Sequence, residues 1–277
     1  MGNSSIQIRL FSPCNLDQGL AESAIRFFVV FGGGSLRPQE CGVYEPFEHF
    51  EESSIAQYAA WIESPGGEFG FRGERRGLRF EGNIRNLSMP EIFSGSSGSH
   101  LTPLPAMRQP YYHSAWTLRV ANHSGLNEHV DLAMSAFREA LSVADAEYGY
   151  AADIEDFQNQ HFRIFREGSS VVEQYIGDDP EDGLPGLYWL NYFGRPYFNF
   201  FGREKLDQTA HFASTSFVKN SAALLQFGST PEESRSANTK RNQQQTIELL
   251  GSSAFFDLRH PDRPLSKPAE IATSKPQ

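Results

Sequence analysis

The chain is poor in features that would place it in several large classes of protein. It has two cysteines in 277 residues, Cys14 and Cys41, so it has neither a disulfide framework nor the Cys/His spacing of a zinc site. Its longest apolar stretch, Ile25 to Phe31, is too short to span a bilayer and contains Arg26. The N-terminus lacks the basic and apolar regions of a secretory signal. These absences predict a soluble protein of a reducing cytoplasm that does not associate with membranes.

Clusters of basic residues are also lacking. The net charge is −10 and the isoelectric point is about 5.3. The one basic run, Arg72 to Arg76, is interrupted by Glu74. Because binding to a phosphate backbone requires clustered Lys and Arg, the composition argues against nucleic acid as a direct ligand.

Recognisable catalytic motifs are absent as well. The sequence contains no GxSxG, HExxH, GxxxxGK[ST] or GxGxxG pattern. The acidic turn Asp178 to Asp182 lacks the ordered ligand spacing of a calcium loop. We therefore predict no cofactor, no metal site and no enzymatic activity. Because the chain is rich in carboxylates, an enzyme with a spatially assembled carboxylate site stays open as an alternative.

The periodicity of apolar residues predicts an α+β fold of two layers, with helices packed on a mixed or mainly antiparallel sheet. We expect one domain over residues 1–263 and a disordered tail over 264–277. Residues 94–110 read as a long irregular connection, Gly82 as a possible β-bulge and Asn15 as a helix cap. The strands are expected at 6–11, 68–72, 78–84, 116–121, 148–152, 162–165, 212–217 and 222–227. The helices are expected at 16–31, 51–62, 127–147 and 203–206, with a further helix start at Thr230 to Glu233.

Acidic and aromatic residues are concentrated side by side. From Asp145 to Asp182 there are eleven acidic and two basic residues, and eight of the seventeen residues from Gly186 to Gly202 are aromatic. A surface that binds a basic partner could have this makeup, since acids steer the encounter and aromatic side chains anchor it. The alternative is that the acids coat a solvated face and the aromatic residues fill a core.

The aromatic segment also carries a resemblance to a known family. The run from Gly183 to Gly194, GLPGLYWLNYFG, resembles the signature of bacterial immunity proteins of polymorphic toxin systems, most closely the immunity protein 52 family. Four further segments fit in the same order: Val43–Phe47, Trp61–Gly67, Asp145–Tyr150 and Phe255–Arg263. The resemblance, which spans about residues 40–263, implies a cytoplasmic α+β protein. It further implies a protein that binds and occludes a cognate toxin, often a nuclease.

Carboxylates could imitate the phosphates that a nuclease binds, so we expect toxin contacts in the acidic segment. The first candidates are Asp178, Asp179, Glu181 and Asp182, and the next are Asp153, Glu155 and Asp156. Tyr188 and Trp189 are weaker candidates. Residues of a family motif stabilise the shared fold more often than they contact a partner that differs between family members. A non-catalytic adaptor of a secretion apparatus is the other alternative.

Overall fold

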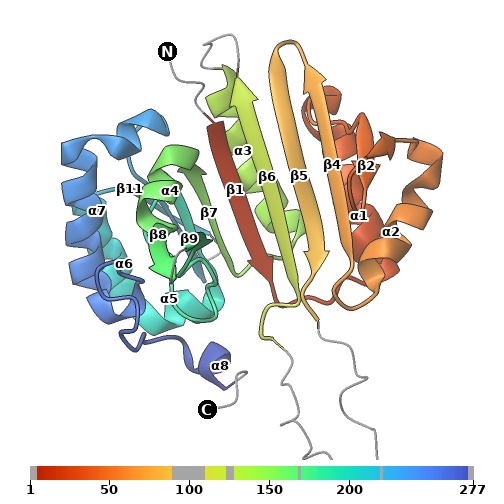
Figure 1. The fold of residues 1–277 in the computed structure, drawn as a ribbon. Helices are drawn as coiled ribbons and strands as arrows, with labels where there is room; N and C mark the ends of the chain where they lie inside the picture. The colour runs from red at the N-terminus through yellow and green to blue at the C-terminus, as the bar shows by residue number, and fades with distance from the viewer. Residues whose placement is uncertain (1–4, 89–109, 123–127, 168–169, 219–220, 274–277) are drawn as a thin grey trace, which may run out of the picture.

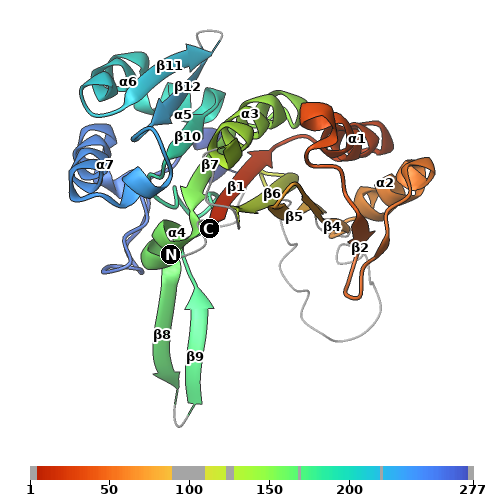
Figure 2. The same ribbon diagram turned by 90° about the horizontal axis from the view of Figure 1, so that it is seen from above.

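The computed structural model describes residues 5–88, 110–122, 128–167, 170–218 and 221–273. Its centre is a ten-stranded sheet in the order β11-β12-β10-β7-β1-β6-β5-β4-β2-β3, in which every neighbouring pair is antiparallel. A separate two-stranded sheet, β8-β9, projects from this body (Figure 2). The predicted α+β class is confirmed.

The strands are β1 (Ser5–Ser12), β2 (Glu40–Gly42), β3 (Glu48–His49), β4 (Glu68–Arg75), β5 (Leu78–Asn86), β6 (Ser114–Asn122), β7 (Tyr148–Asp153), β8 (Phe162–Glu167), β9 (Ser170–Tyr175), β10 (Leu190–Phe193), β11 (Ser214–Val218) and β12 (Ala222–Gln226). The α-helices are α1 (Gln18–Gly34), α2 (Ile55–Glu63), α3 (Glu128–Val143), α4 (Ile154–His161), α5 (Arg195–Phe201), α6 (Arg203–Gln208), α7 (Ala237–Leu250) and α8 (Ala269–Ala272). The short 3₁₀ helices are η1 (Glu52–Ser54), η3 (Thr209–His211), η4 (Glu232–Arg235) and η5 (Ser252–Ala254). None of the described helices is both long and apolar enough to cross a membrane.

One core lies between the first half of the sheet and three helices. Successive side chains of a strand point to opposite faces, so Ile6, Ile8 and Leu10 of β1 share a face. All three are buried in one cluster with residues of α1, α2 and α3. In Figure 1, α3 lies behind β1 and β6 and α1 lies behind the β4 side of the sheet, and no described helix covers the opposite face of β1, β6 and β5.

A second core lies on the other face of the sheet, over β7, β10 and β12. Tyr148, Phe193 and Leu225 belong to it, together with buried residues of α4 to α8. Strand β7 serves both cores, because Ala151 faces the first and Tyr148 the second. Each half of the sheet is therefore covered by helices on one face, and the covered face of the first half is opposite to that of the second half.

Several predicted details differ from the structure. Asp17, not Asn15, caps α1, and its carboxylate accepts a hydrogen bond from the N–H of Leu20. Helix α3 ends at Val143, four residues before the predicted end, because the chain turns at Asp145 with a positive φ of 47°. Gly82 forms no bulge, since β4 and β5 pair in an uninterrupted register. Most of the predicted irregular connection, residues 94–109, lies outside the described residues.

The expected disorder after Pro264 does not hold for residues 264–273. Ile271 on α8 is fully buried in the second core. The Nζ atom of Lys267 donates to the carbonyl oxygen of Glu181 at 2.8 Å. The segment is polar and rich in proline, so its composition suggested disorder, but one buried isoleucine and a few polar contacts hold it against the domain.

Candidate protein-binding surface

The β8–β9 hairpin is the element with the most unusual exposure. Ile164, Val171 and Tyr175 expose 59%, 61% and 45% of their surface. Ile164 pairs with Glu173, which lies two positions from both Val171 and Tyr175 on β9, so all three apolar side chains share one face of the ribbon. An isolated two-stranded hairpin is at best marginally stable in water. This ribbon therefore combines exposed apolar surface with no covering layer among the described residues.

The root of the hairpin is held by α4. The N–H of Ile176 donates to the carbonyl oxygen of His161 at 3.1 Å, which closes the ribbon at its base. The ring of Phe157 stacks on Tyr175 with centroids 5.9 Å apart, and Gln158 donates to the hydroxyl of Tyr175 at 3.3 Å. The position of the hairpin thus follows from the position of α4.

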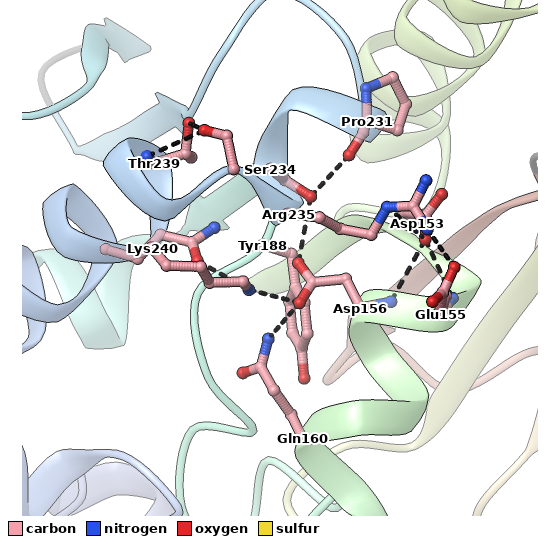
Figure 3. Close-up of polar contacts among 12 residues, drawn as sticks. Asp153, Glu155, Asp156, Gln160, Tyr188, Pro231, Ser234, Arg235, Thr239 and Lys240 are labelled. Atoms are coloured by element: carbon pink, nitrogen blue, oxygen red, sulfur yellow. Dashed lines mark hydrogen bonds and ion pairs between the residues drawn. The ribbon is translucent and has the colours of Figure 1, made fainter.

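A buried polar network fixes α4 to the C-terminal helices (Figure 3). Asp156 is 1% exposed and accepts hydrogen bonds from Gln160 at 3.0 Å and from Ser234 of η4 at 3.1 Å. It also forms an ion pair with Lys240 of α7. A buried carboxylate is stable only when its oxygens are paired in this way. Asp156 is therefore a structural residue that joins α4 to η4 and α7.

Asp153 and Glu155 belong to the same network. The carboxylate of Asp153 caps α4, accepting from the N–H groups of Glu155 at 3.0 Å and Asp156 at 3.2 Å. Burial raises the pKa of Asp153, and Arg235, 3.7 Å away, opposes that rise. Glu155 is exposed and forms an ion pair with Arg235. Of these three predicted contacts, only Glu155 presents its side chain to solvent.

The acidic turn after β9 is also partly internal. The Glu181 carboxylate is 4% exposed and accepts a hydrogen bond from the N–H of Tyr112 at 2.9 Å. Asp178 forms an ion pair with Arg9 of β1 at 3.0 Å. Asp179 and Asp182 are exposed at the root of the hairpin, and Asp179 also accepts from the N–H of Glu181 at 2.9 Å. The sequence-predicted acidic face thus reduces to Glu155, Asp179 and Asp182, with Asp178 half-exposed.

Tyr188 and Trp189 are both 0% exposed. The hydroxyl of Tyr188 forms a hydrogen bond with Nε2 of His161, and Trp189 lies in the first core with Leu190 and Leu224. A side chain with no accessible surface does not touch a partner unless the fold opens, so we remove both residues from the candidate surface. The aromatic signature is a core element here.

A face of the sheet that no described helix covers lies beside the hairpin, which projects on the side opposite α1 and α3 (Figure 2). Across β2, β4, β5 and β6, the residues Glu40, Arg72, Glu81 and Arg119 are direct neighbours in register and alternate in charge. Arg72 pairs with Glu40, and Arg119 with Glu81 at 3.0 Å. Exposed ion pairs contribute about 0–1 kcal/mol of stability each, so this row keeps the face hydrated more than it stabilises the sheet.

Sequence reasoning did not single out this face or the hairpin as a surface. The available signal for the face was the alternation of charged residues within 72–85. In the described part of the chain, no cluster of three or more His, Cys, Asp or Glu side chains could hold a metal ion.

Comparisons with known proteins give a similarity of fold only. A scan against models of protein families finds no match, and a search of curated proteins finds none. The fold is similar to that of the Pseudomonas aeruginosa T6SS protein PA0821, with a TM-score of 0.55 over 89% of this chain and 73% of that chain. The two sequences are 10% identical, so this similarity concerns the fold alone. The resemblance to the immunity protein 52 family accordingly rests on the short motifs quoted above.

Proposed function

We propose that this protein is a non-catalytic inhibitor that binds and neutralises a cognate bacterial toxin, using the β8–β9 hairpin and the adjoining uncovered sheet face. The observation that carries the proposal is the hairpin itself, with Ile164, Val171 and Tyr175 exposed on one face. Clustered exposed apolar side chains on a projecting element are typical of an interaction site.

The surroundings of the hairpin fit a partner that is basic near its active site. Glu155, Asp179 and Asp182 are exposed close to the hairpin root, and such acids accelerate the encounter with a basic surface. A nuclease that binds phosphates would present such a surface. Apolar side chains of the ribbon would then form the buried centre of the interface, where most of the binding energy concentrates.

The similarity of fold to a protein of a type VI secretion system (T6SS) supports a role in secretion-linked competition between bacteria. Together with the motif resemblance to immunity proteins, it makes a secreted toxin the preferred partner. A protein of a secretion system could equally be an adaptor, so an adaptor is the second candidate function. The adaptor requires a partner that is harmless when produced alone.

The test is co-expression with the product of the adjacent gene in cells that this product kills. Rescue of growth and a co-purifying complex are expected. Ile164→Glu with Val171→Glu should abolish rescue and weaken the complex at least about 30-fold, the loss of a hot spot of about 2 kcal/mol. Both side chains are exposed, so the free protein should remain folded.

The matched control is Val30→Glu on α1. Val30 is 67% exposed and lies away from the hairpin, so this change should leave rescue intact. Undiminished affinity in the hairpin variant would remove the hairpin from the interface. Rescue of growth without a complex would favour an enzymatic or indirect route. If the product of the adjacent gene kills cells and this protein does not restore their growth, the proposal that it neutralises that toxin is wrong.

A further inference from the structure

A second candidate site lies on the other face of the sheet. A cleft of about 770 Å³ opens between the end of α3, the start of α5 and the β11–β12 hairpin. Helices α5 to α7 pack on the opposite face of β10 and β12, so among the described residues no helix covers this sheet face beside α3. Leu141, Tyr192 and Leu224 provide apolar lining, and the volume is in the range of sites that bind small ligands or peptide segments.

The carboxylates of the cleft have hydrogen-bond partners, whereas its two arginines form no ion pair in the described part of the chain. Glu147 accepts a hydrogen bond from the hydroxyl of Tyr111, and Asp145 lies 3.5 Å from the Sγ atom of Cys14. By contrast, Arg138 and Arg195 are exposed in the cleft and form no ion pair within 4 Å with any described residue. The charge of Arg195 still acts on Glu147, where it opposes the rise that burial causes in the pKa of that carboxyl. Eight other arginines of the described chain do form ion pairs. The donors available to a ligand are therefore two guanidinium groups.

Guanidinium groups bind carboxylates and phosphates through two parallel hydrogen bonds. The nearby carboxylates of Asp145 and Glu147 repel a doubly charged phosphate more than a singly charged carboxylate. The chemistry of the lining thus favours a carboxylate attached to an apolar or extended body.

The position of β11 favours a peptide as the extended molecule that carries the carboxylate. Strand β11 is the last strand of the sheet, and Ser216 and Val218 on it line the cleft. An extended segment beside an edge strand presents alternate side chains to one face of the sheet. We propose that the cleft binds an extended acidic peptide segment of a protein partner, with its carboxylates on Arg138 and Arg195. This site is separate from the hairpin and does not depend on toxin neutralisation.

The test measures fluorescence anisotropy of a labelled peptide, Val-Glu-Val-Glu-Val-Glu, on the full chain. The peptide should bind, and the matched peptide with Gln in place of Glu should bind at least about tenfold more weakly. Arg138→Gln with Arg195→Gln should also weaken binding of the acidic peptide about tenfold or more, since two charge-assisted contacts are lost. Val218→Glu, an exposed position in the cleft, should repel the same peptide.

The control is Arg79→Gln with Arg241→Gln, which removes the same charge from two exposed arginines outside the cleft. This control should retain the affinity of the wild type. Equal losses in both double variants, or equal binding of the Glu and Gln peptides, would overturn the proposal. Competition by inorganic phosphate that exceeds competition by acetate at equal concentration would assign the arginines to phosphate instead.

Discussion

At the scale of single residues, Asp156 carries the junction between α4 and α7. Asp156→Ala would leave Lys240, Ser234 and Gln160 without their common acceptor. We expect the free energy of unfolding, measured in urea, to fall by about 3 kcal/mol, the lower end for a broken buried pair because Lys240 can still reach water. Glu155→Ala removes an exposed ion pair and should cost about 0–1 kcal/mol. Equal losses in the two variants would contradict a structural role specific to Asp156.

His161 gives the same junction a dependence on pH. Its Nδ1 lies 2.7 Å from the carbonyl oxygen of Ile176, which can only accept, so Nδ1 carries a proton, and Nε2 shares a hydrogen bond with the Tyr188 hydroxyl. Burial lowers the pKa of His161; the Ile176 carbonyl and the charges of Asp178 and Asp156 oppose that shift, and Arg9 adds to it.

The sign of the effect follows from proton binding. In the unfolded chain histidine titrates near pH 6.5, so below that pH the unfolded state binds more protons and stability decreases down to the lower folded pKa. We expect the free energy of unfolding to decrease from pH 7 to pH 5, and to decrease less in His161→Gln. The exposed control His49→Gln should keep the wild-type pH dependence. An unchanged dependence in the His161 variant would assign the effect to other groups.

At the scale of secondary structure, alternation predicted eight of the twelve described strands, because a half-buried strand has an unambiguous period of two; β2, β3, β9 and β10 were not predicted. The bounds of β4, β5, β11 and β12 were predicted to within three residues. Helix α4 was missed, since its eight residues are mostly polar. The capping Asp153 followed by Glu155 and Asp156 was the available signal, as acids are favoured in a first turn. The same acids had been counted as a surface.

The candidate surface was harder to predict than the strands, because burial of acids depends on distant partners. Arg235 and Lys240, which pair with Glu155 and Asp156, come 80 and 84 positions later in the chain. Local composition gave the charge of the segment correctly but not its accessibility. The exposed face beside β11 follows from which half of the main sheet each helix covers, whereas β8–β9 is a separate two-stranded sheet.

At the scale of the whole molecule, the sheet has helices on one face in its first half and on the other face in its second half, with β7 in both cores. The hairpin projects on the side opposite α1 and α3 (Figure 2), and the cleft lies between α3 and the β11–β12 strands. A partner on the hairpin and a peptide in the cleft would therefore bind on opposite sides of the sheet.

The C-terminal segment closes the second core and supports the acidic turn at the hairpin root. The Cδ1 atom of Leu265 would lie 2.3 Å from a Cβ atom at Gly183, and Lys267 holds the carbonyl oxygen of Glu181. Ile271→Ala should lower the free energy of unfolding by about 2–4 kcal/mol, since it empties a fully buried site. It should also increase proteolysis within residues 178–183. Glu270→Ala, an exposed position on the same helix, should change neither measurement; a stable, protease-resistant Ile271 variant would show that the segment packs without supporting that turn.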